Sequence, residues 1–230
     1  NLKNMLKSMG FYINGIIFDG LSQSQIILED QEKQQGALLI DIGGQSTKIC
    51  YFKNNLLLHS SIVPIASETI SSDISKCLDV SLPEAERIKI LYGDIFLDRL
   101  ESKDVIEINT KKEGRKSIKH LLLCQIIEAR FKELFGHIQR QFSTITQSST
   151  TTVICGGGGN IKGLPEWVKK HFTSNLRVGL PDALKPVIES SSYSNSIGLV
   201  VYGLKTNAIA YTYHKKSFLQ TCGQWIKSFQ

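Results

Sequence analysis

The 230-residue sequence predicts an α/β protein with a mixed sheet and flanking helices. Residues 37–52 have the pattern of a strand, a tight turn and a second strand. Residues 151–154 are a short apolar run that leads into four glycines, and residues 121–138 repeat apolar side chains at helical spacing. Strands that alternate with amphipathic helices are typical of a sheet with helices packed on it.

The composition is that of an ordinary globular chain, with 41% hydrophobic and 21% charged residues, and the length predicts one large domain or two small ones. The five cysteines form no Cys-x-x-Cys pair, and the five histidines have no metal-ligand spacing. This favours reduced thiols in the cytosol over disulfides or a zinc site. No stretch approaches the ~20 apolar residues of a membrane span, and no signal peptide is visible. Because the chain starts with Asn, we expect it to be part of a longer protein.

The net charge is +6, and the excess is concentrated in two places. Residues 204–230 carry four lysines and no acidic residue. The other cluster consists of Lys111, Lys112, Arg115, Lys116 and Lys119. A nucleic-acid partner is not expected, because no aromatic side chains are interleaved with the central cluster as a base-stacking platform requires.

The stretch that organises the chain is residues 37–52, where an apolar run ends in Asp41 and a Gly-Gly turn follows. Two glycines let backbone N–H groups approach an anion closely, and Ser46 and Thr47 add hydroxyl donors. An unpaired buried carboxylate is costly, and a water-bridged Mg²⁺ at a phosphate would account for Asp41. A plain hairpin whose Asp acts as a cap explains this stretch equally well.

Upstream of this hairpin, apolar spacing predicts a helix over residues 2–9 and a short strand over residues 13–18. Residues 19–24 are a small-residue junction before another helix, and residues 31–36 predict a polar turn. Downstream, residues 56–64 predict a further strand.

A helix is expected from residue 68, capped by Ser71 or Ser72. The next helix begins at Pro83, a favoured first-turn residue, and stops at Gly93.

Residues 105–108 alternate as a strand does, and residues 111–119 predict a basic turn. The apolar face of residues 121–138 predicts a long helix, and residues 141–152, rich in Ser, Thr and Gln, predict a loop.

A second glycine-rich element follows the strand at 151–154, where the sequence CGGGGNIKG leads into a helix through Trp167 and Phe172. Glycines between a strand and a helix N-terminus suit an anion or nucleotide. The spacing is neither that of a P-loop nor that of a dinucleotide fold. Tight helix–strand packing is the alternative, although four glycines are more than packing usually needs. Residues 177–181 predict a strand and turn, and residues 194–203 a small-residue helix.

Together these elements resemble the actin-like ATPases, and most closely the FtsA family of bacterial division proteins. ALLIDIGGQSTKI resembles that family's second phosphate motif, and ICGGGGNIKGLPEWV resembles its adenosine motif. The segments IVPIASETISSDISKCL, PEAERIKILYG, IIEARFKELF and SNSIGLVVYG follow in the family's order. The resemblance covers nearly the whole chain.

The resemblance implies half of an actin-like (ribonuclease H-like) fold, with the first phosphate loop upstream of this chain. Residues 1–67 and 139–203 would form a large nucleotide-binding subdomain with its returning helix. Residues 68–138 would form an inserted smaller α/β subdomain, and residues 204–230 a linker and a membrane-targeting helix.

The resemblance also implies an ATP and Mg²⁺ site. Glu86 would bind the ribose hydroxyls and Lys89 would lie along the base; as an alternative, this i, i+3 pair is a surface ion pair. Asp41 would lie near Mg²⁺ through water. The residues implied at the phosphates and under the nucleoside are Gly43, Gly44, Gln45, Ser46, Gly156, Gly157 and Gly158.

This sequence departs from the family pattern at the phosphate turn. Gln45 and Ser46 replace a common glycine and threonine, Lys48 stands where an acid is frequent, and Ala66 and Ser67 replace a Gly-rich pair. We therefore expect an ATP-binding scaffold with at most slow ATPase activity.

The C-terminal tail predicts a basic amphipathic helix of the kind that binds an anionic membrane surface. It resembles the family's membrane-targeting helix; docking on its own domain is the alternative. The apolar residues that would insert are Phe218, Leu219, Trp225, Ile226 and Phe229, and the basic ones are Lys215, Lys216 and Lys227.

The resemblance implies a division protein that binds ATP, polymerises and tethers the FtsZ ring to the cytoplasmic face of the inner membrane at the septum. The smaller subdomain would receive the C-terminal tail of FtsZ. Two alternatives stay open: another actin-like scaffold of MreB or pilus-assembly type, and a relative of the sugar or acetate kinases.

Overall fold

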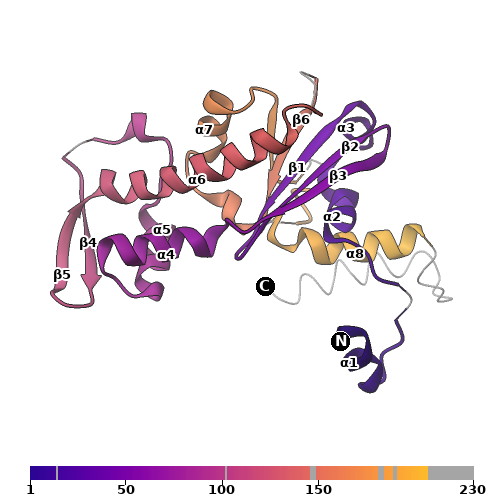
Figure 1. Ribbon diagram of the computed structural model, residues 1–230, viewed down its shortest axis with the longest axis horizontal. Coiled ribbons are helices and arrows are strands. Elements are labelled where there is room, and N and C mark those ends of the chain that lie inside the picture. The colour runs from indigo at the N-terminus through magenta and orange to yellow at the C-terminus, as the bar shows by residue number, and fades with distance from the viewer. Residues whose placement is uncertain (14, 102, 146–148, 181–183, 189–190, 207–230) are drawn as a thin grey trace.

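A five-stranded mixed sheet lies at the centre of the computed structural model, which describes residues 1–206 except 14, 102, 146–148, 181–183 and 189–190 (Figure 1). The strand order is β3-β2-β1-β6-β7. The first three strands pair antiparallel, whereas β6 and β7 run parallel to β1. The strands are β1 (Ala37–Ile42), β2 (Thr47–Lys53), β3 (Leu56–Val63), β6 (Thr151–Cys155) and β7 (Leu176–Val178).

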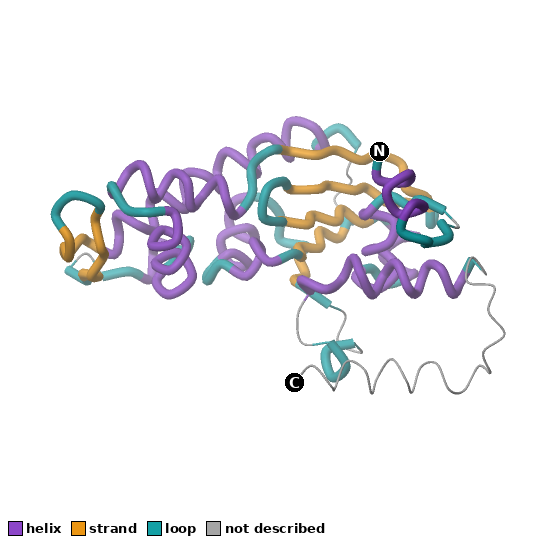
Figure 2. Tube along the Cα trace, turned by 90° about the horizontal axis from the view of Figure 1, so that it is seen from below, coloured by secondary structure: helices purple, strands orange, loops and turns teal. Residues whose placement is uncertain are grey.

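Helices cover both faces of this sheet, which explains why every residue of β1 is buried (Figure 2). Leu39 packs in a cluster with Ile27 of α2, against which the partly buried Ile197 of α8 also packs. Ile40, on the other face, belongs to a cluster with side chains of α4, α6 and α7. The helices are α2 (Asp19–Ile27), α4 (Ser67–Leu78), α6 (His120–Phe142), α7 (Leu164–His171) and α8 (Ser194–Lys205).

A smaller group of elements extends from the sheet along α6. It contains α4, α5 (Leu82–Tyr92), the turn η1 (Leu97–Arg99) and a hairpin of β4 (Val105–Thr110) and β5 (Gly114–Lys119) (Figure 1). The predicted bounds of α5 are confirmed: Ser81 caps its start, Pro83 lies in its first turn and Gly93 follows its end. The division of the chain into subdomains stays a prediction.

Two predictions upstream of the sheet are wrong. The strand predicted at residues 13–18 is not formed by the described residues of that range, because they have no ladder partner, and Ile16 is 84% exposed. The predicted turn at 31–36 is a helix, α3 (Asp30–Gln35), because Glu29 and Glu32 form a reciprocal capping box. Helix α1 (Leu2–Ser8) is confirmed.

Two further expectations need correction. Helix α4 is capped at Ala66 and not at Ser71 or Ser72, since Ser71 lies inside the helix and its hydroxyl bonds the carbonyl of Ser67. The basic turn expected at 111–119 is a turn only as far as Glu113, because residues 114–119 pair with β4. The second glycine element forms the turn η2 (Gly157–Asn160) before α7 begins, and a third turn, η3 (Ser191–Tyr193), precedes α8.

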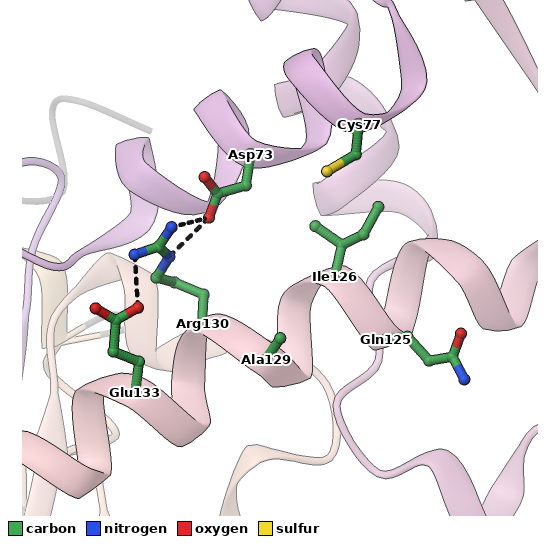
Figure 3. A pocket seen from close by; sticks show the side chains of 7 residues that line it. All are labelled: Asp73, Cys77, Gln125, Ile126, Ala129, Arg130 and Glu133. Carbon is green, nitrogen blue, oxygen red and sulfur yellow. Dashed lines mark hydrogen bonds and ion pairs between the residues drawn. The ribbon is translucent and has the colours of Figure 1, made fainter.

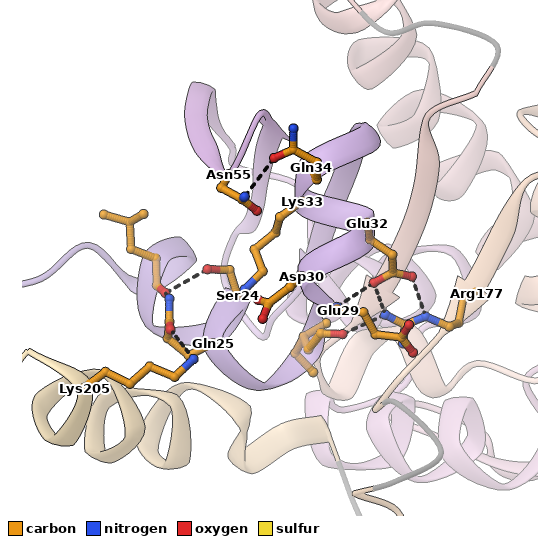
Figure 4. A network of polar contacts seen from close by, with 12 residues as sticks. Ser24, Gln25, Glu29, Asp30, Glu32, Lys33, Gln34, Asn55, Arg177 and Lys205 are labelled. Atoms are coloured by element: carbon orange, nitrogen blue, oxygen red, sulfur yellow. Dashed lines mark hydrogen bonds and ion pairs between the residues drawn. The ribbon is translucent and has the colours of Figure 1, made fainter.

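A half-buried ion pair joins α3 to the edge strand β7 (Figure 4). Arg177 of β7 donates to both carboxylate oxygens of Glu32 on α3, at 2.9 and 2.7 Å, and also to the carbonyl of Ile27 at 2.7 Å. This bidentate pair fixes the α2–α3 connection against the parallel side of the sheet.

Across the residues that the structure describes, none of the helices has both the length and the apolarity to cross a membrane. The predicted membrane helix, with Lys215, Lys216, Phe218, Leu219, Trp225, Ile226, Lys227 and Phe229, lies outside these residues.

Candidate functional site

The carboxyl ends of β1 and β6 bring the two glycine-rich elements together. In the parallel pairing Asp41 lies opposite Cys155, so the turn after Ile42 lies beside the glycines after Cys155. A Cβ atom on Gly158 would lie 2.6 Å from Cγ2 of Ile42. Because α/β sheets bind ligands outside the carboxyl ends of their strands, this edge is the candidate site.

The hairpin turn offers backbone donors to an anion. The amide of Gly43 donates to the carbonyl of Ser46 at 3.1 Å and so closes the turn. The amides of Gly44, Gln45 and Ser46 donate to no backbone carbonyl within the described part of the chain. Gly44 and Gln45 are exposed, and a turn of this kind presents N–H groups as an anion-binding concavity.

The same turn is fixed to the start of α4. The amides of Ser67 and Glu68 donate to the carbonyls of Gly43 at 3.1 Å and Gly44 at 2.8 Å. Two unsatisfied donors of the helix N-terminus are thereby paired with the turn. A Cβ atom on Gly44 would lie 3.1 Å from Oε1 of Glu68, so residue 44 has little room for a side chain.

Asp41 is only 6% exposed and has three neighbours of known geometry. Its Oδ2 accepts from Nε2 of Gln23 at 2.8 Å and lies 3.8 Å from Nζ of Lys48. Its Oδ1 faces the backbone of Gly156, where an added Cβ would lie 2.3 Å away. The burial expected for Asp41 is therefore observed, and protein groups pair with it.

Lys48 is held between two carboxylates. It forms an ion pair with Asp19 at the start of α2 as well as facing Asp41. Burial opposes the charged form of Lys48, but the bond with Asp19 and the charge of Asp41 outweigh it, so its pKa is raised. The same bond lowers the pKa of Asp19, and both groups are charged at neutral pH.

These side chains do not fit a Mg²⁺ ion held by the protein. Mg²⁺ usually keeps several waters and takes one or two protein carboxylates, and both carboxylates here, Asp41 and Asp19, already face the Lys48 ammonium. Oδ2 of Asp41 already accepts from Gln23, and a divalent ion beside it would face the Lys48 ammonium. A Mg²⁺ ion carried by nucleotide phosphates stays a prediction.

The Glu86–Lys89 pair is buried at its lysine end, so it is more than a surface ion pair. Lys89 is 3% exposed and its Nζ lies 2.7 Å from Oε2 of Glu86. It also donates to the carbonyl of Ser67 at 3.1 Å and to Oγ of Ser71 at 2.9 Å. Through Ser67, the pair connects to the carbonyl of Gly43 and hence to the hairpin turn.

Burial of Glu86 opposes its charged form, but the bonds from Lys89 and Ser71 outweigh burial and lower its pKa. Its side chain remains 45% exposed, so one face of the carboxylate is open to a ligand. The structure thus connects all the expected site residues through the carboxyl ends of β1 and β6 and the start of α4. Their roles toward a nucleotide stay predictions.

Sequence reasoning missed several residues of this site. Gln23 and Asp19 lie in a segment that only suggested a junction, and Ser67 appeared only as a departure from a family pattern. Lys48 was visible as a basic residue where an acid is frequent. No local signal showed that it pairs with Asp19, 29 positions away.

Two hollows of the surface lie elsewhere. One, of about 460 Å³, lies between α4 and α6, where Arg130 bonds Asp73 at 2.6 Å and Glu133 at 2.7 Å (Figure 3). The other, of about 640 Å³, lies between residues 6–17 and α8 and is mostly apolar. The glycine turns line neither hollow.

The sequence model of the family described as cell division protein FtsA matches residues 38–198. The chain is 29% identical to the cell division protein FtsA of Buchnera aphidicola subsp. Baizongia pistaciae, over 99% of this chain and 59% of that protein. It is 25% identical to FtsA of Escherichia coli K12, over 98% of this chain and 58% of that protein. The chain thus spans less than two thirds of the length of these relatives.

Solved structures share the fold. MreB5 of Spiroplasma citri bound to ADP superposes with a TM-score of 0.73 at 18% identity, over 91% of this chain and 66% of that one. A PilM–PilN type IV pilus biogenesis complex gives a TM-score of 0.65 at 17% identity, over 88% of this chain and 56% of that one. These likenesses confirm the predicted actin-like fold, with its mixed sheet and flanking helices.

Proposed function

The chain belongs to the FtsA family of cell division proteins, and we propose that it binds ATP, assembles with further copies and tethers the FtsZ ring to the inner membrane at the septum. Because the chain covers only 59% of its Buchnera relative, these properties are proposed for a protein that also contains the rest of the fold. The proposal assigns ATP the role of a switch for assembly, with at most slow hydrolysis.

The observation that best supports nucleotide binding is that the two glycine-rich elements, residues 43–44 and 156–159, lie against each other. Gly158 and Gly43 approach so closely that a Cβ on the former would lie 3.2 Å from the carbonyl of the latter. The free amides of the hairpin turn suit the phosphates, the glycines after β6 suit the flat nucleoside, and the open side of Glu86 suits ribose hydroxyls. When bound, Mg²⁺ would neutralise phosphate charge.

Calorimetric titration of the full-length protein with ATP tests this part. We expect Glu86→Ala to weaken ATP binding, because it removes the acceptor for the ribose. Glu113→Ala, on the exposed turn of the β4–β5 hairpin, is the control for loss of a negative charge. Unchanged ATP affinity in Glu86→Ala would contradict the assigned role.

The membrane part rests on the amphipathic pattern of residues 215–230. Co-sedimentation with anionic and neutral liposomes, with and without these residues, tests it. We expect binding that needs both the tail and anionic lipid, because each lysine near an anionic leaflet contributes roughly 1 kcal/mol. Sedimentation that is equal on neutral lipid, or equal without the tail, would contradict a targeting role.

The FtsZ part assigns the C-terminal tail of FtsZ to residues 68–138. Exposed basic side chains on the β4–β5 hairpin, among them Lys112 and Arg115, support the capture of an acidic peptide. A pull-down with FtsZ tail peptide tests this assignment. The variant to compare has Lys112 and Arg115 both changed to Ser. If it still retains the peptide, these basic side chains contribute little to FtsZ binding.

A second candidate is another actin-like scaffold of MreB or pilus-assembly type. The likeness to MreB5 and to a PilM–PilN complex favours it, and a MamK double helical filament with a TM-score of 0.57 supports self-association in either case. Failure of both the liposome and the FtsZ experiments would favour this candidate. A sugar or acetate kinase relative is the remaining alternative, and phosphoryl transfer to a small molecule would support it.

A further inference from the structure

Lys48 places a fixed positive charge beside the carboxylate expected to lie at the metal. It is opposite Asp41 in the β1–β2 ladder, and its Nζ lies 3.8 Å from Oδ2 of Asp41. Asp19 holds the same ammonium from α2. The three side chains therefore bring one positive and two negative charges together, and the positive one comes from the protein.

The Lys48 side chain is partly open to solvent. The side chain of Lys48 is 24% exposed, in contrast with Lys89, whose side chain is 3% exposed and surrounded by α4 and α5. In the sequence, Lys48 follows the hairpin turn by two residues. A lysine has a flexible four-carbon stem and a compact charge, a combination used widely to bind phosphate.

We propose that the Lys48 ammonium is the protein's own cation at the phosphate end of the site, where it binds the phosphates of a nucleoside di- or triphosphate in place of a metal ion held by Asp41. The inference rests on the proposed nucleotide binding and names the group that recognises the phosphates. Its consequence is that affinity for ATP depends on Lys48 and depends little on Mg²⁺.

Affinities of the full-length protein for ATP and for adenosine, each measured in Mg²⁺ and in EDTA, test the proposal. For the wild type, we expect removal of Mg²⁺ to change the ATP dissociation constant by less than about threefold. Lys48→Met removes a charge-assisted bond to phosphate and should weaken ATP binding by about tenfold or more. Binding of adenosine, which has no phosphate, should not change.

Two further variants separate a role of Lys48 in phosphate binding from a purely structural role. Lys169→Met, at an exposed lysine of α7, is the matched control and should leave both affinities unchanged. Lys48→Met removes the cation shared by Asp19 and Asp41, so Lys48→Met with Asp19→Asn is made to keep the net charge of the three side chains unchanged. This double variant should fold, as circular dichroism checks, and should show the same selective loss of ATP binding.

Three results would overturn the inference. ATP binding that falls more than about threefold in EDTA would show that the metal supplies the charge at the phosphates, and it would leave the proposed nucleotide binding intact. An equal loss for adenosine and ATP in the double variant would show a structural role for Lys48. A wild type that binds neither ligand would contradict the nucleotide part of the proposed function, and this inference with it.

Discussion

A Cβ atom on Gly156 would lie 2.3 Å from Oδ1 of Asp41, closer than real Cβ contacts allow. It would also lie 2.5 Å from the carbonyl oxygen of Ile42. Gly156 has φ +86°, a conformation that side chains disfavour. The first glycine after β6 therefore lets the chain pass directly over the carboxylate at the end of β1.

We expect Gly156→Ala to lower the free energy of unfolding by about 3 kcal/mol, the sum of overpacking and backbone strain. Neither obstacle can move cheaply, because one is backbone of β1 and the other is a buried carboxylate bonded to Gln23. Urea unfolding followed by circular dichroism measures the change.

Gly114→Ala separates the two contributions. Gly114 has φ +72°, but a Cβ there meets nothing within 4 Å. Its substitution should cost only about 1 kcal/mol, the backbone term alone. Equal losses at the two positions would show that the approach of Gly156 to Asp41 is not tight in solution.

Lys89→Met should lower the free energy of unfolding by about 2 kcal/mol, since it removes the buried bonds of the ammonium to Ser67, Ser71 and Glu86. The loss should be accompanied by weaker ATP binding, because Ser67 positions the hairpin turn through Gly43. Unfolding and ATP titration of the same variant measure both effects.

Lys132→Met on α6 is the matched control. Lys132 pairs with Glu128 at i, i+4 and its side chain is 56% exposed, so its loss should cost at most about 0.5 kcal/mol. Equal losses of stability in Lys89→Met and Lys132→Met would mean that Lys89 is as solvated in the folded protein as a surface lysine.

The sequence predicted the elements whose signals are local. Helix α5 was found because Pro83 and Gly93 mark its ends, and the three central strands were found because their apolar residues face packed helices. The proximity of the two glycine-rich elements was predicted from the resemblance of the motif order to the FtsA family. The local pattern of neither stretch indicated it.

Most errors of prediction occurred where contacts between distant parts of the chain determine the local structure. Residues 13–18 have strand-like residues, but a strand forms only beside a partner, and the edges of the described sheet are β3 and β7. The partners of Asp41 come from Gln23 and Lys48, on two other elements, so no spacing rule indicated them. Helix α3 is an exception, since its signal is local: the capping box joins Glu29 to Glu32, and Glu32 lay in the predicted polar turn at 31–36.

Glu84 gives the fold a dependence on pH. Its bond from Arg87 holds its pKa below the ordinary value of 4.5, and it also accepts from the amide of Asn109 on β4. A lowered pKa stabilises the fold above the unfolded-state pKa, and this contribution is lost as pH falls through the folded-state pKa. The difference in stability between wild type and Glu84→Gln should therefore shrink as pH falls from about 7 to about 3.

Chemical denaturation at each pH measures this difference. Gln keeps an oxygen for the amide of Asn109, so the comparison isolates the charge. Glu113→Gln, on the exposed hairpin turn, controls for general loss of a surface carboxylate. A difference that stays constant across the range would mean that Glu84 titrates alike in the folded and unfolded chain.

The four cysteines that the structure describes should differ sharply in reactivity, because the thiolate is the species that alkylates. Cys77 is exposed on α4, whereas Cys50, Cys124 and Cys155 are buried. Burial raises the pKa of Cys50 to about 12 and that of Cys124 to about 11, and it raises the pKa of Cys155 well above its ordinary value.

In the folded protein near pH 7.5, iodoacetamide should therefore label Cys77 at least about a hundredfold faster than the three buried thiols. In urea the four rates should converge, which controls for intrinsic differences between peptides. Mass spectrometry of the alkylated peptides reads each residue separately. Cys155 follows Ile154 at the end of β6 and lies opposite Asp41, so rapid labelling of Cys155 in the folded state would mean that the candidate site opens on the time scale of the reaction.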